Sequence, residues 1–290
     1  MRLVSYVEEG NTRIGVLDPA GAQVREFRVP WLAGAWSMAD FIREGLESLA
    51  LMKLGPARDL SDVKLLAPLF APRRNIICVG KNYHEHAKEF SSSGFDASAT
   101  EVVPEFPVIF SKNVGSVSGP GDPIPASDDV DGSVDYEGEL AVVIGRGGRN
   151  IDPEAAMSHV FGYTIVNDVT ARQAQRRHKQ WFLGKSLDGF CPMGPSIVTQ
   201  DEIPDLKKVE LRTFVNGEIR QRSSIGNLIF GIPEVVSTIS RFMKLIPGDV
   251  IATGTPSGVG IGFDPPKFLR PGDEVVVEID GIGELRNPVV

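Results

Sequence analysis

The chain has 290 residues, a formal net charge of −8 and 42% hydrophobic residues. This length suits one large domain, or a large domain joined to a small one, with an ordinary globular core. Because nucleic acids and anionic membranes are bound through clustered lysine and arginine, this charge disfavours both as partners. A small anionic substrate remains compatible, provided that a metal ion makes its pocket locally positive.

The two cysteines, Cys78 and Cys191, form no metal or redox motif, so we expect two buried free thiols in a reducing compartment. The N-terminus is charged too early for the apolar region of a signal peptide. No apolar run reaches the roughly 20 residues that a membrane helix needs. We therefore expect a cytoplasmic protein.

The N-terminal segment predicts a small α/β domain. Residues 2–9 and 12–18 alternate in polarity and are rich in β-branched residues, as in two strands joined by a short Gly-Asn turn. Ser37 is placed to cap a helix over 37–53, where apolar residues recur at helical spacing.

The rest of the chain reads mainly as β-structure. A strand is expected within 63–74, and we place a domain boundary near Phe70, which gives domains at 1–70 and 71–290. Further strands are expected at 75–80, 107–112, 138–145, 161–166, 195–199, 207–217, 249–255 and 273–285. Helices are expected at 83–90, 170–180 and 232–244, and a mobile loop at 91–104. Many strands and few helices predict a β-rich α+β fold.

Acidic residues gather at the start of the strand that runs through 138–145. Side chains alternate along a strand, so Asp135, Glu137 and Glu139 are expected on one side. Carboxylates this close raise each other's pKa unless a cation lies between them. A solvated strand end is the alternative interpretation of this segment alone.

Asp168 adds a carboxylate where a strand passes directly into a helix. A plain helix N-cap is the alternative role for this residue. Three carboxylates with no Cys or His nearby would form an all-oxygen site, which suits Mg²⁺, Mn²⁺ or Ca²⁺ better than zinc. Mg²⁺ usually keeps water ligands, which leaves positions for a chelating substrate.

Five motifs, in this order, resemble the fumarylacetoacetate hydrolase family. They are VGKNYHEHAKE (79–89), DYEGELAVVIG (135–145), NDVTARQAQ (167–175), the lysine of WFLGKSLDGF (181–190) and TGTPSGVG (253–260). The resemblance runs from about residue 72 to the C-terminus. It implies a mixed, β-roll-like catalytic domain, often preceded by a small N-terminal domain, and a homodimer.

The resemblance also implies roles for particular residues. It assigns Glu137, Glu139 and Asp168 as ligands of a divalent cation, Mg²⁺ or Mn²⁺, with Ca²⁺ as the alternative. His86 and Glu89 match a His–Glu pair on a short helix beside a lid. The residues placed around a metal-bound substrate are Arg172, Gln175, Lys185 and Thr255. Gln173 stands where many members have an acidic residue, which bears on fine specificity and not on the metal.

The residue types fit these roles physically. His86 and Glu89 are spaced to share a helix face, and a carboxylate fixes the tautomer of an imidazole and raises its basicity. Such a base can activate water, an effect worth roughly 10²–10⁴-fold. Arg172 can grip a carboxylate with two hydrogen bonds, and Lys185, in an apolar stretch, is expected to be partly buried beside an anion. Solvated helix faces or a structural ion pair are the alternatives.

We therefore expect a metal-dependent hydrolase that cleaves a carbon–carbon bond in a small 2-oxo or 1,3-dicarbonyl acid. The metal would hold the enolate that forms, His86 with Glu89 would activate water, and Lys185 would act in catalysis. A decarboxylase or a tautomerase could use the same site. A metal- and ligand-binding protein without turnover is the alternative from another class.

Two other enzyme classes lack their motifs. Ser257 in GTPSG has the wrong spacing for the G-x-S-x-G elbow of an α/β-hydrolase. Gly184-Lys185-Ser186 lacks the earlier glycine of a phosphate-binding loop, since that position is Lys179.

Overall fold

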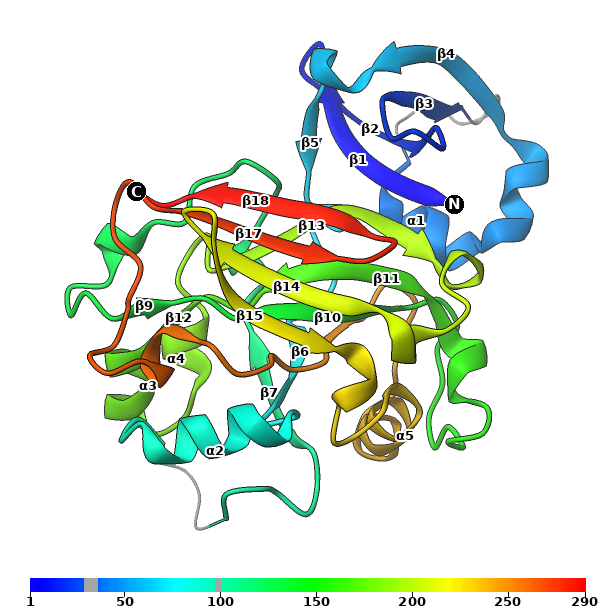
Figure 1. Cartoon of the computed structure of the whole chain (residues 1–290). Helices are drawn as coiled ribbons and strands as arrows, with labels where there is room; N and C mark the ends of the chain where they lie inside the picture. The colour runs from blue at the N-terminus through cyan, green and yellow to red at the C-terminus, as the bar shows by residue number, and fades with distance from the viewer. Residues whose placement is uncertain (29–35, 97–100) are drawn as a thin grey trace.

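The computed structural model describes residues 1–28, 36–96 and 101–290 (Figure 1). Within them, the largest sheet follows the order β4-β3-β2-β1-β13-β11-β10-β16-β6-β7. These strands are β4 (Lys53–Asp59), β3 (Gln23–Arg28), β2 (Asn11–Leu17), β1 (Arg2–Glu8), β13 (Cys191–Thr199), β11 (Val160–Asn167), β10 (Gly138–Ile144), β16 (Val250–Ala252), β6 (Ile76–Gly80) and β7 (Val108–Lys112). Two short strands extend it, since β5 (Lys64–Leu66) pairs with β1 and β8 (Val117–Ser118) pairs with β13.

A second sheet packs on the first one. Its order is β15 (Glu218–Ser224), β14 (Glu210–Val215), β17 (Glu274–Ile279) and β18 (Gly283–Pro288). In Figure 1 it lies in front of β10 and β11. A two-stranded ladder, β9 (Val134–Asp135) with β12 (Thr170–Ala171), lies beside these sheets.

The core forms on both faces of β10, which is buried along its whole length. Leu140 and Val142 belong to the core shared with the second sheet. Ala141 and Val143 point the other way, into a core that includes Phe41 of α1 (Met38–Glu44). A strand covered on both faces reads as a continuous apolar run, which explains the sequence of this segment.

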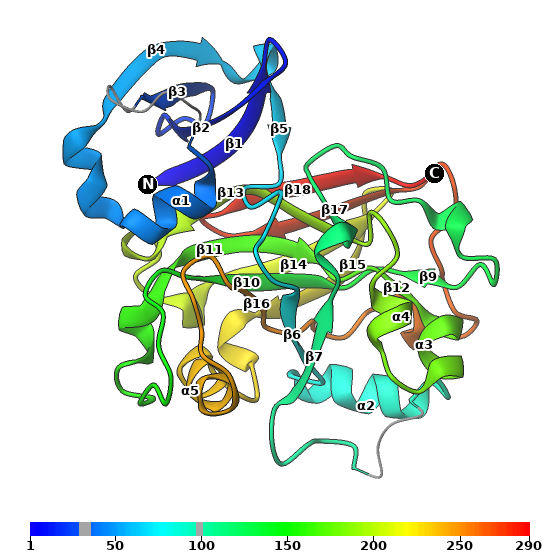
Figure 2. The ribbon, with the colours of Figure 1, turned by 180° about the vertical axis from the view of Figure 1, so that it is seen from behind.

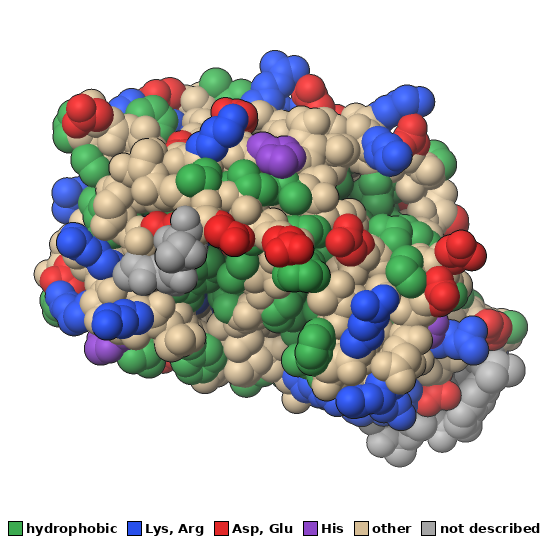
Figure 3. Space-filling view, turned by 90° about the horizontal axis from the view of Figure 1, so that it is seen from below, with side chains coloured by type: hydrophobic (Ala, Val, Ile, Leu, Met, Phe, Trp, Pro, Cys, Tyr) green, Lys and Arg blue, Asp and Glu red, His purple; other side chains and the backbone are tan. Residues whose placement is uncertain are grey.

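The remaining α-helices lie away from the N-terminal strands. They are α2 (His84–Ser92), α3 (Arg172–His178), α4 (Phe182–Lys185) and α5 (Ile232–Phe242). Seen from behind, α2, α3 and α4 gather around the end of the molecule near β7 and β12 (Figure 2). Viewed from below, acidic, basic and apolar side chains are interspersed over the surface (Figure 3).

The predicted sheet-rich α+β architecture is confirmed, and so is the predicted burial of the two cysteines as free thiols. Cys78 and Cys191 are free and buried, and burial raises the pKa of Cys191 to about 12. Among the described residues, no helix is long and apolar enough to span a membrane.

The predicted helix over 37–53 is wrong beyond its first two turns. Ser37 caps α1 as expected, since its side chain accepts from Asp40 N. The helix then ends at Gly45, whose positive φ of 80° is a conformation that glycine adopts without steric cost. A 3₁₀ helix (Leu46–Leu51) and the unpredicted strand β4 follow.

Two segments predicted as single strands contain turns. Residues 207–217 end in Asn216 and Gly217, which both have positive φ and form the turn of the β14–β15 hairpin. Residues 273–285 hold both β17 and the start of β18.

The predicted loop at 91–104 and the predicted domain boundary near Phe70 differ in how far the structure tests them. Ser91 and Ser92 lie in α2, not in a loop. Residues 97–100 of the predicted mobile loop lie outside the described residues. The boundary near Phe70 stays a prediction; β1 pairs with β13 at Leu3 and Ile197, so the N-terminal strands continue the large sheet.

Packing between the two sheets should carry much of the stability. Leu211 of β14 is fully buried in their shared core, so Leu211→Ala should lower the free energy of unfolding by about 2–5 kcal/mol. Val130→Ala, at a side chain that is 93% exposed, is the control and should change it by less than about 0.5 kcal/mol. Urea denaturation followed by circular dichroism measures both. Equal stability of the two variants would contradict this description of the core.

Candidate active site

Three carboxylates meet at one end of the β10–β11 pair. One oxygen from each of Glu137, Glu139 and Asp168 lies within 4.8 Å of the others, and all three residues are buried. The antiparallel register places Gly138 opposite Asn167, and Asp168 N donates to Glu137 O at 2.8 Å. The backbone ladder therefore fixes this grouping, and Asp168 is not the N-cap of α3, which is Ala171.

Gly138, between the two glutamates, leaves room for the second sheet. A Cβ at this position would lie 2.3 Å from Thr213 Oγ1 and 2.9 Å from Val277 Cγ1. Contacts this short do not occur, so a side chain at Gly138 would push the second sheet away from the strand that carries the acids.

Three buried cations balance most of this charge. Lys185 Nζ lies 2.7 Å from both Glu137 Oε2 and Asp168 Oδ2. Lys112 Nζ lies 2.7 Å from Asp168 Oδ1, and an Arg172 nitrogen lies 2.6 Å from Glu137 Oε1. Removing one partner from such buried pairs leaves an uncompensated charge, so they act as one unit.

Glu139 has a different environment from Glu137. Among the described residues it forms no ion pair, and its Oε2 accepts a 2.7 Å hydrogen bond from Gly254 N. Burial, together with the charges of Asp168 and Glu137, raises the pKa of Glu139 well above its usual range. Burial would also raise the pKa of Glu137, but Lys185 and Arg172 outweigh it and lower that pKa to about 2. Glu139 is thus the carboxylate of this group that lacks a cationic partner among the described residues.

A divalent cation fits this group. Four buried carboxylates, counting Asp135, face three buried cations, and the potential ligands Glu137, Glu139 and Asp168 offer only oxygen atoms. Oxygen donors of this kind suit Mg²⁺ or Mn²⁺. A cation beside Glu139 would remove the excess negative charge and make the site attractive to an anionic substrate.

Asp135 does not join the three carboxylates, although its position in the sequence suggested that it would. It lies on the separate strand β9, where its carboxylate accepts from Arg172 Nε at 2.9 Å and from Gly260 N at 2.6 Å. Asp135 thus holds Arg172, and Arg172 in turn contacts Glu137.

The glycine-rich loop 253–260 contacts the protein's own acids through its backbone. Gly254 N donates to Glu139, Gly258 N donates to Glu89 at 2.9 Å, and Gly260 N donates to Asp135. At Gly258 the φ is +100°, and a Cβ would lie 1.9 Å from Arg220 O. Only glycine allows this approach. These glycines therefore position the carboxylates around the site.

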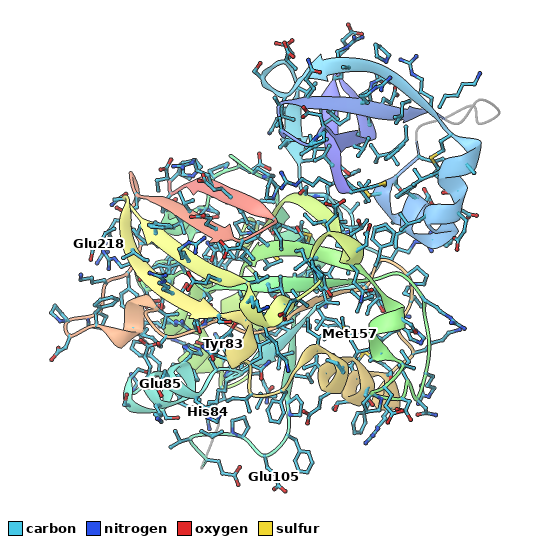
Figure 4. The ribbon with its side chains drawn as sticks, turned by 45° about the vertical axis from the view of Figure 1, so that its right-hand side comes forward. Tyr83, His84, Glu85, Glu105, Met157 and Glu218 are labelled. Atoms are coloured by element: carbon cyan, nitrogen blue, oxygen red, sulfur yellow. The ribbon has the colours of Figure 1, made fainter. Side chains whose placement is uncertain are left out.

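The His–Glu pair forms as predicted on α2. His86 Nδ1 lies 3.2 Å from Glu89 Oε2, and His86 is 5% exposed. With Nδ1 engaged by Glu89, Nε2 is the ring nitrogen left for the pocket. His84 and Glu85, on the first turn of the same helix, are exposed, and Figure 4 shows them at the outer side of α2.

One pocket brings most of the predicted residues together. Its lining includes His86, Glu137, Glu139, Arg172, Gln175, Lys185 and Thr255. Arg172 donates to Gln175 Oε1 at 3.2 Å, and the Thr255 hydroxyl donates to Gly138 O at 2.9 Å. Gln175 therefore orients Arg172, and Thr255 ties the glycine-rich loop to β10.

Sequence reasoning missed several residues of this site. Phe90, Phe110 and Trp181 form an apolar wall, and Lys81 adds a cation to the lining. Lys112, the buried partner of Asp168, ends strand β7. A lysine that ends an apolar strand was the available signal for Lys112, but its partner lies far along the chain.

Comparisons with known proteins agree with this geometry. The family described as fumarylacetoacetate (FAA) hydrolase C-terminal matches residues 75–290. The oxaloacetate tautomerase YisK of Bacillus subtilis is 53% identical over 230 residues, which is 79% of this chain and 74% of that protein.

Solved structures show the same fold. The fumarylacetoacetate hydrolase of Exiguobacterium antarcticum has a TM-score of 0.83 and 45% identity, with 100% of this chain and 99% of that one covered. A 5-carboxymethyl-2-hydroxymuconate delta-isomerase from Mycobacterium smegmatis has a TM-score of 0.77 and 39% identity, with the same coverage. The chain belongs to the fumarylacetoacetate hydrolase family.

Proposed function

We propose that this protein is a metal-dependent tautomerase of small 2-oxo dicarboxylic acids of the oxaloacetate type. The observation that carries the proposal is the acidic group of Glu137, Glu139 and Asp168, which opens onto the same pocket as His86. The relative that is 53% identical is an oxaloacetate tautomerase, and a structural neighbour is an isomerase of a related unsaturated acid.

The metal would be held by Glu137, Glu139 and Asp168. When bound, it would supply a Lewis acid that stabilises negative charge on the substrate oxygens. This fits the excess negative charge at Glu139, which no described side chain neutralises.

Lys185 and Arg172 hold the acidic group in place and add positive charge to the pocket wall. Both line the pocket while bonded to Glu137. A substrate carboxylate that enters beside them would meet fixed positive groups instead of mobile water. These groups would stabilise the negative charge of the substrate.

His86 is the group we assign to proton transfer. In the direction from keto to enol form, its Nε2 takes a proton from C3, the C–H electrons form the C2–C3 double bond, and the electrons of the C2=O π bond move to O2. The His86 imidazolium then gives that proton to O2 and returns to its neutral form. Glu89 holds Nδ1 at 3.2 Å and stabilises the charged imidazolium that this step creates. The Glu89 carboxylate is itself fixed by Gly258 N.

Hydrolysis of a carbon–carbon bond is the second candidate. The same His86–Glu89 pair could activate water, and the neighbour from Exiguobacterium antarcticum is named a fumarylacetoacetate hydrolase. The sequence alone favoured this reaction; we now rank it second because both an isomerase and a tautomerase stand among the similar proteins.

Product analysis separates these reactions. Purified protein with Mg²⁺ or Mn²⁺ should speed the interconversion of enol and keto oxaloacetate, measured by ultraviolet absorbance, and EDTA should abolish the effect. Acetylpyruvate should stay intact. Formation of acetate and pyruvate from acetylpyruvate would favour hydrolysis, and loss of CO₂ from oxaloacetate would favour decarboxylation. If the metal-loaded protein changes none of these acids, the proposed tautomerase is wrong.

The assignment of His86 has its own test. His86→Gln should lower kcat by about 10²–10⁴-fold, the usual contribution of a positioned general base, while divalent-metal binding stays intact. Glu89→Gln should lower it less, because the imidazole remains. His84→Gln, on the exposed side of the same helix, is the control and should retain full activity. Equal activity of His86→Gln and His84→Gln would remove His86 from the mechanism.

A further inference from the structure

Lys81 occupies an unusual position for a lysine. It directly follows β6, lines the pocket and is only 3% exposed. Its φ of 54° lies in the left-handed region, which is uncommon for a residue with a side chain. Such backbone outliers persist where surrounding structure enforces them, often at ligand-binding sites.

The backbone directly before Lys81 packs against the aromatic wall of the pocket. A Cβ on Gly80 would lie 2.3 Å from the Trp181 ring, so the indole rests directly on the backbone at the end of β6. Trp181 also packs edge-on against Phe90, and Lys81 Nζ lies 5.6 Å from the centre of the Phe90 ring. The Lys81 side chain therefore lies against the aromatic wall of the pocket.

The ammonium group of Lys81 keeps donor capacity. It forms a buried ion pair with Asp96, and a long contact of 3.5 Å with Glu101 O. A lysine ammonium has three N–H donors. Among the described residues, Lys81 has one strong partner and one weak partner, which leaves room for a further anion on the pocket side.

The other cations of the site are bound to the acidic group. Arg172 contacts Asp135 and Glu137, and Lys185 bridges Glu137 and Asp168. Lys112 contacts Asp168 and does not line the pocket. Lys81 is thus the lysine of the pocket lining whose ion pair lies outside the acidic group.

We propose that Lys81 binds the distal carboxylate of a dicarboxylate substrate and so selects dianionic over monoanionic 2-oxo acids. The ligand class rests on the proposed function. The metal-side end of the substrate would face Glu137, Glu139 and Asp168, while the far carboxylate would share Lys81 with Asp96. Without such a cation, a second carboxylate would face the apolar wall of Phe90, Phe110 and Trp181 at a large desolvation cost.

Two inert acids test this selection by binding alone. Malate and 2-hydroxybutanoate both carry a 2-hydroxy acid, but only malate has the distal carboxylate, and neither can enolise. Calorimetry with the Mg²⁺- or Mn²⁺-loaded wild-type protein should show tighter binding of malate. Lys81→Met should weaken the affinity for malate by about 10–100-fold, the range of a lost charge-assisted hydrogen bond. It should leave the affinity for 2-hydroxybutanoate within about twofold of the wild-type value.

Matched variants separate ligand binding from a structural role. Lys81→Arg keeps the charge and should recover part of the malate affinity. Asp96→Asn removes the protein's own partner of Lys81 and should leave malate binding equal or tighter. If Asp96→Asn weakens malate binding as much as Lys81→Met does, Lys81 only anchors Asp96 and the proposal is wrong. Lys88→Met, an exposed lysine of α2, is the neutral control.

The outcome for Lys81 is distinguishable from the outcome for tautomerase activity. A Lys81-dependent preference for malate in a protein that does not turn over oxaloacetate would keep this inference and refute the proposed reaction. Oxaloacetate turnover, together with equal effects of Lys81→Met on the affinities for malate and 2-hydroxybutanoate, would support the proposed reaction and refute this inference. Failure of malate to bind the wild-type protein would overturn the inference.

Discussion

Four carboxylates are buried within one small region of this protein, and the site depends on how their charge is balanced. An isolated buried carboxylate is costly and would take up a proton instead of remaining charged. The chain prevents this for Glu137 with Lys185 and Arg172, which lower its pKa to about 2. It leaves Glu139 without a cation among the described residues. A single carboxylate without a cationic partner, in a group that is otherwise neutralised, is the property that favours a divalent cation here.

This balance draws together distant parts of the fold. Lys112 comes from the edge of the large sheet, Arg172 from α3 and Lys185 from α4. Backbone N–H groups of the glycine-rich loop add hydrogen bonds to Glu139, Glu89 and Asp135. Any displacement of one element would therefore change the pKa values of groups held by the others. The aromatic wall and Lys81 complete the lining of the pocket.

Much of this arrangement could be predicted from the sequence, because its signals are local. The apolar run after Glu139 marks a buried strand, and the three-residue spacing of His86 and Glu89 places them on one helix face. The turn at Asn216-Gly217 and the helix end at Gly45 also have local signals, although the apolar pattern around each one favours a continuous element. The pairing of Lys112 with Asp168, and of Arg172 with Asp135, has no such signal, because those contacts depend on how the sheets and helices pack.

A calorimetric titration of the metal-free protein with Mn²⁺ is the sharpest test of this charge balance. Wild-type protein should bind one ion, and Glu139→Gln should lose most of that affinity because it removes the one carboxylate that no described cation neutralises. Glu85→Gln, at an exposed glutamate of α2, should bind as wild type does. Undiminished Mn²⁺ binding by Glu139→Gln, or none by the wild-type protein, would contradict the central role of this acidic group.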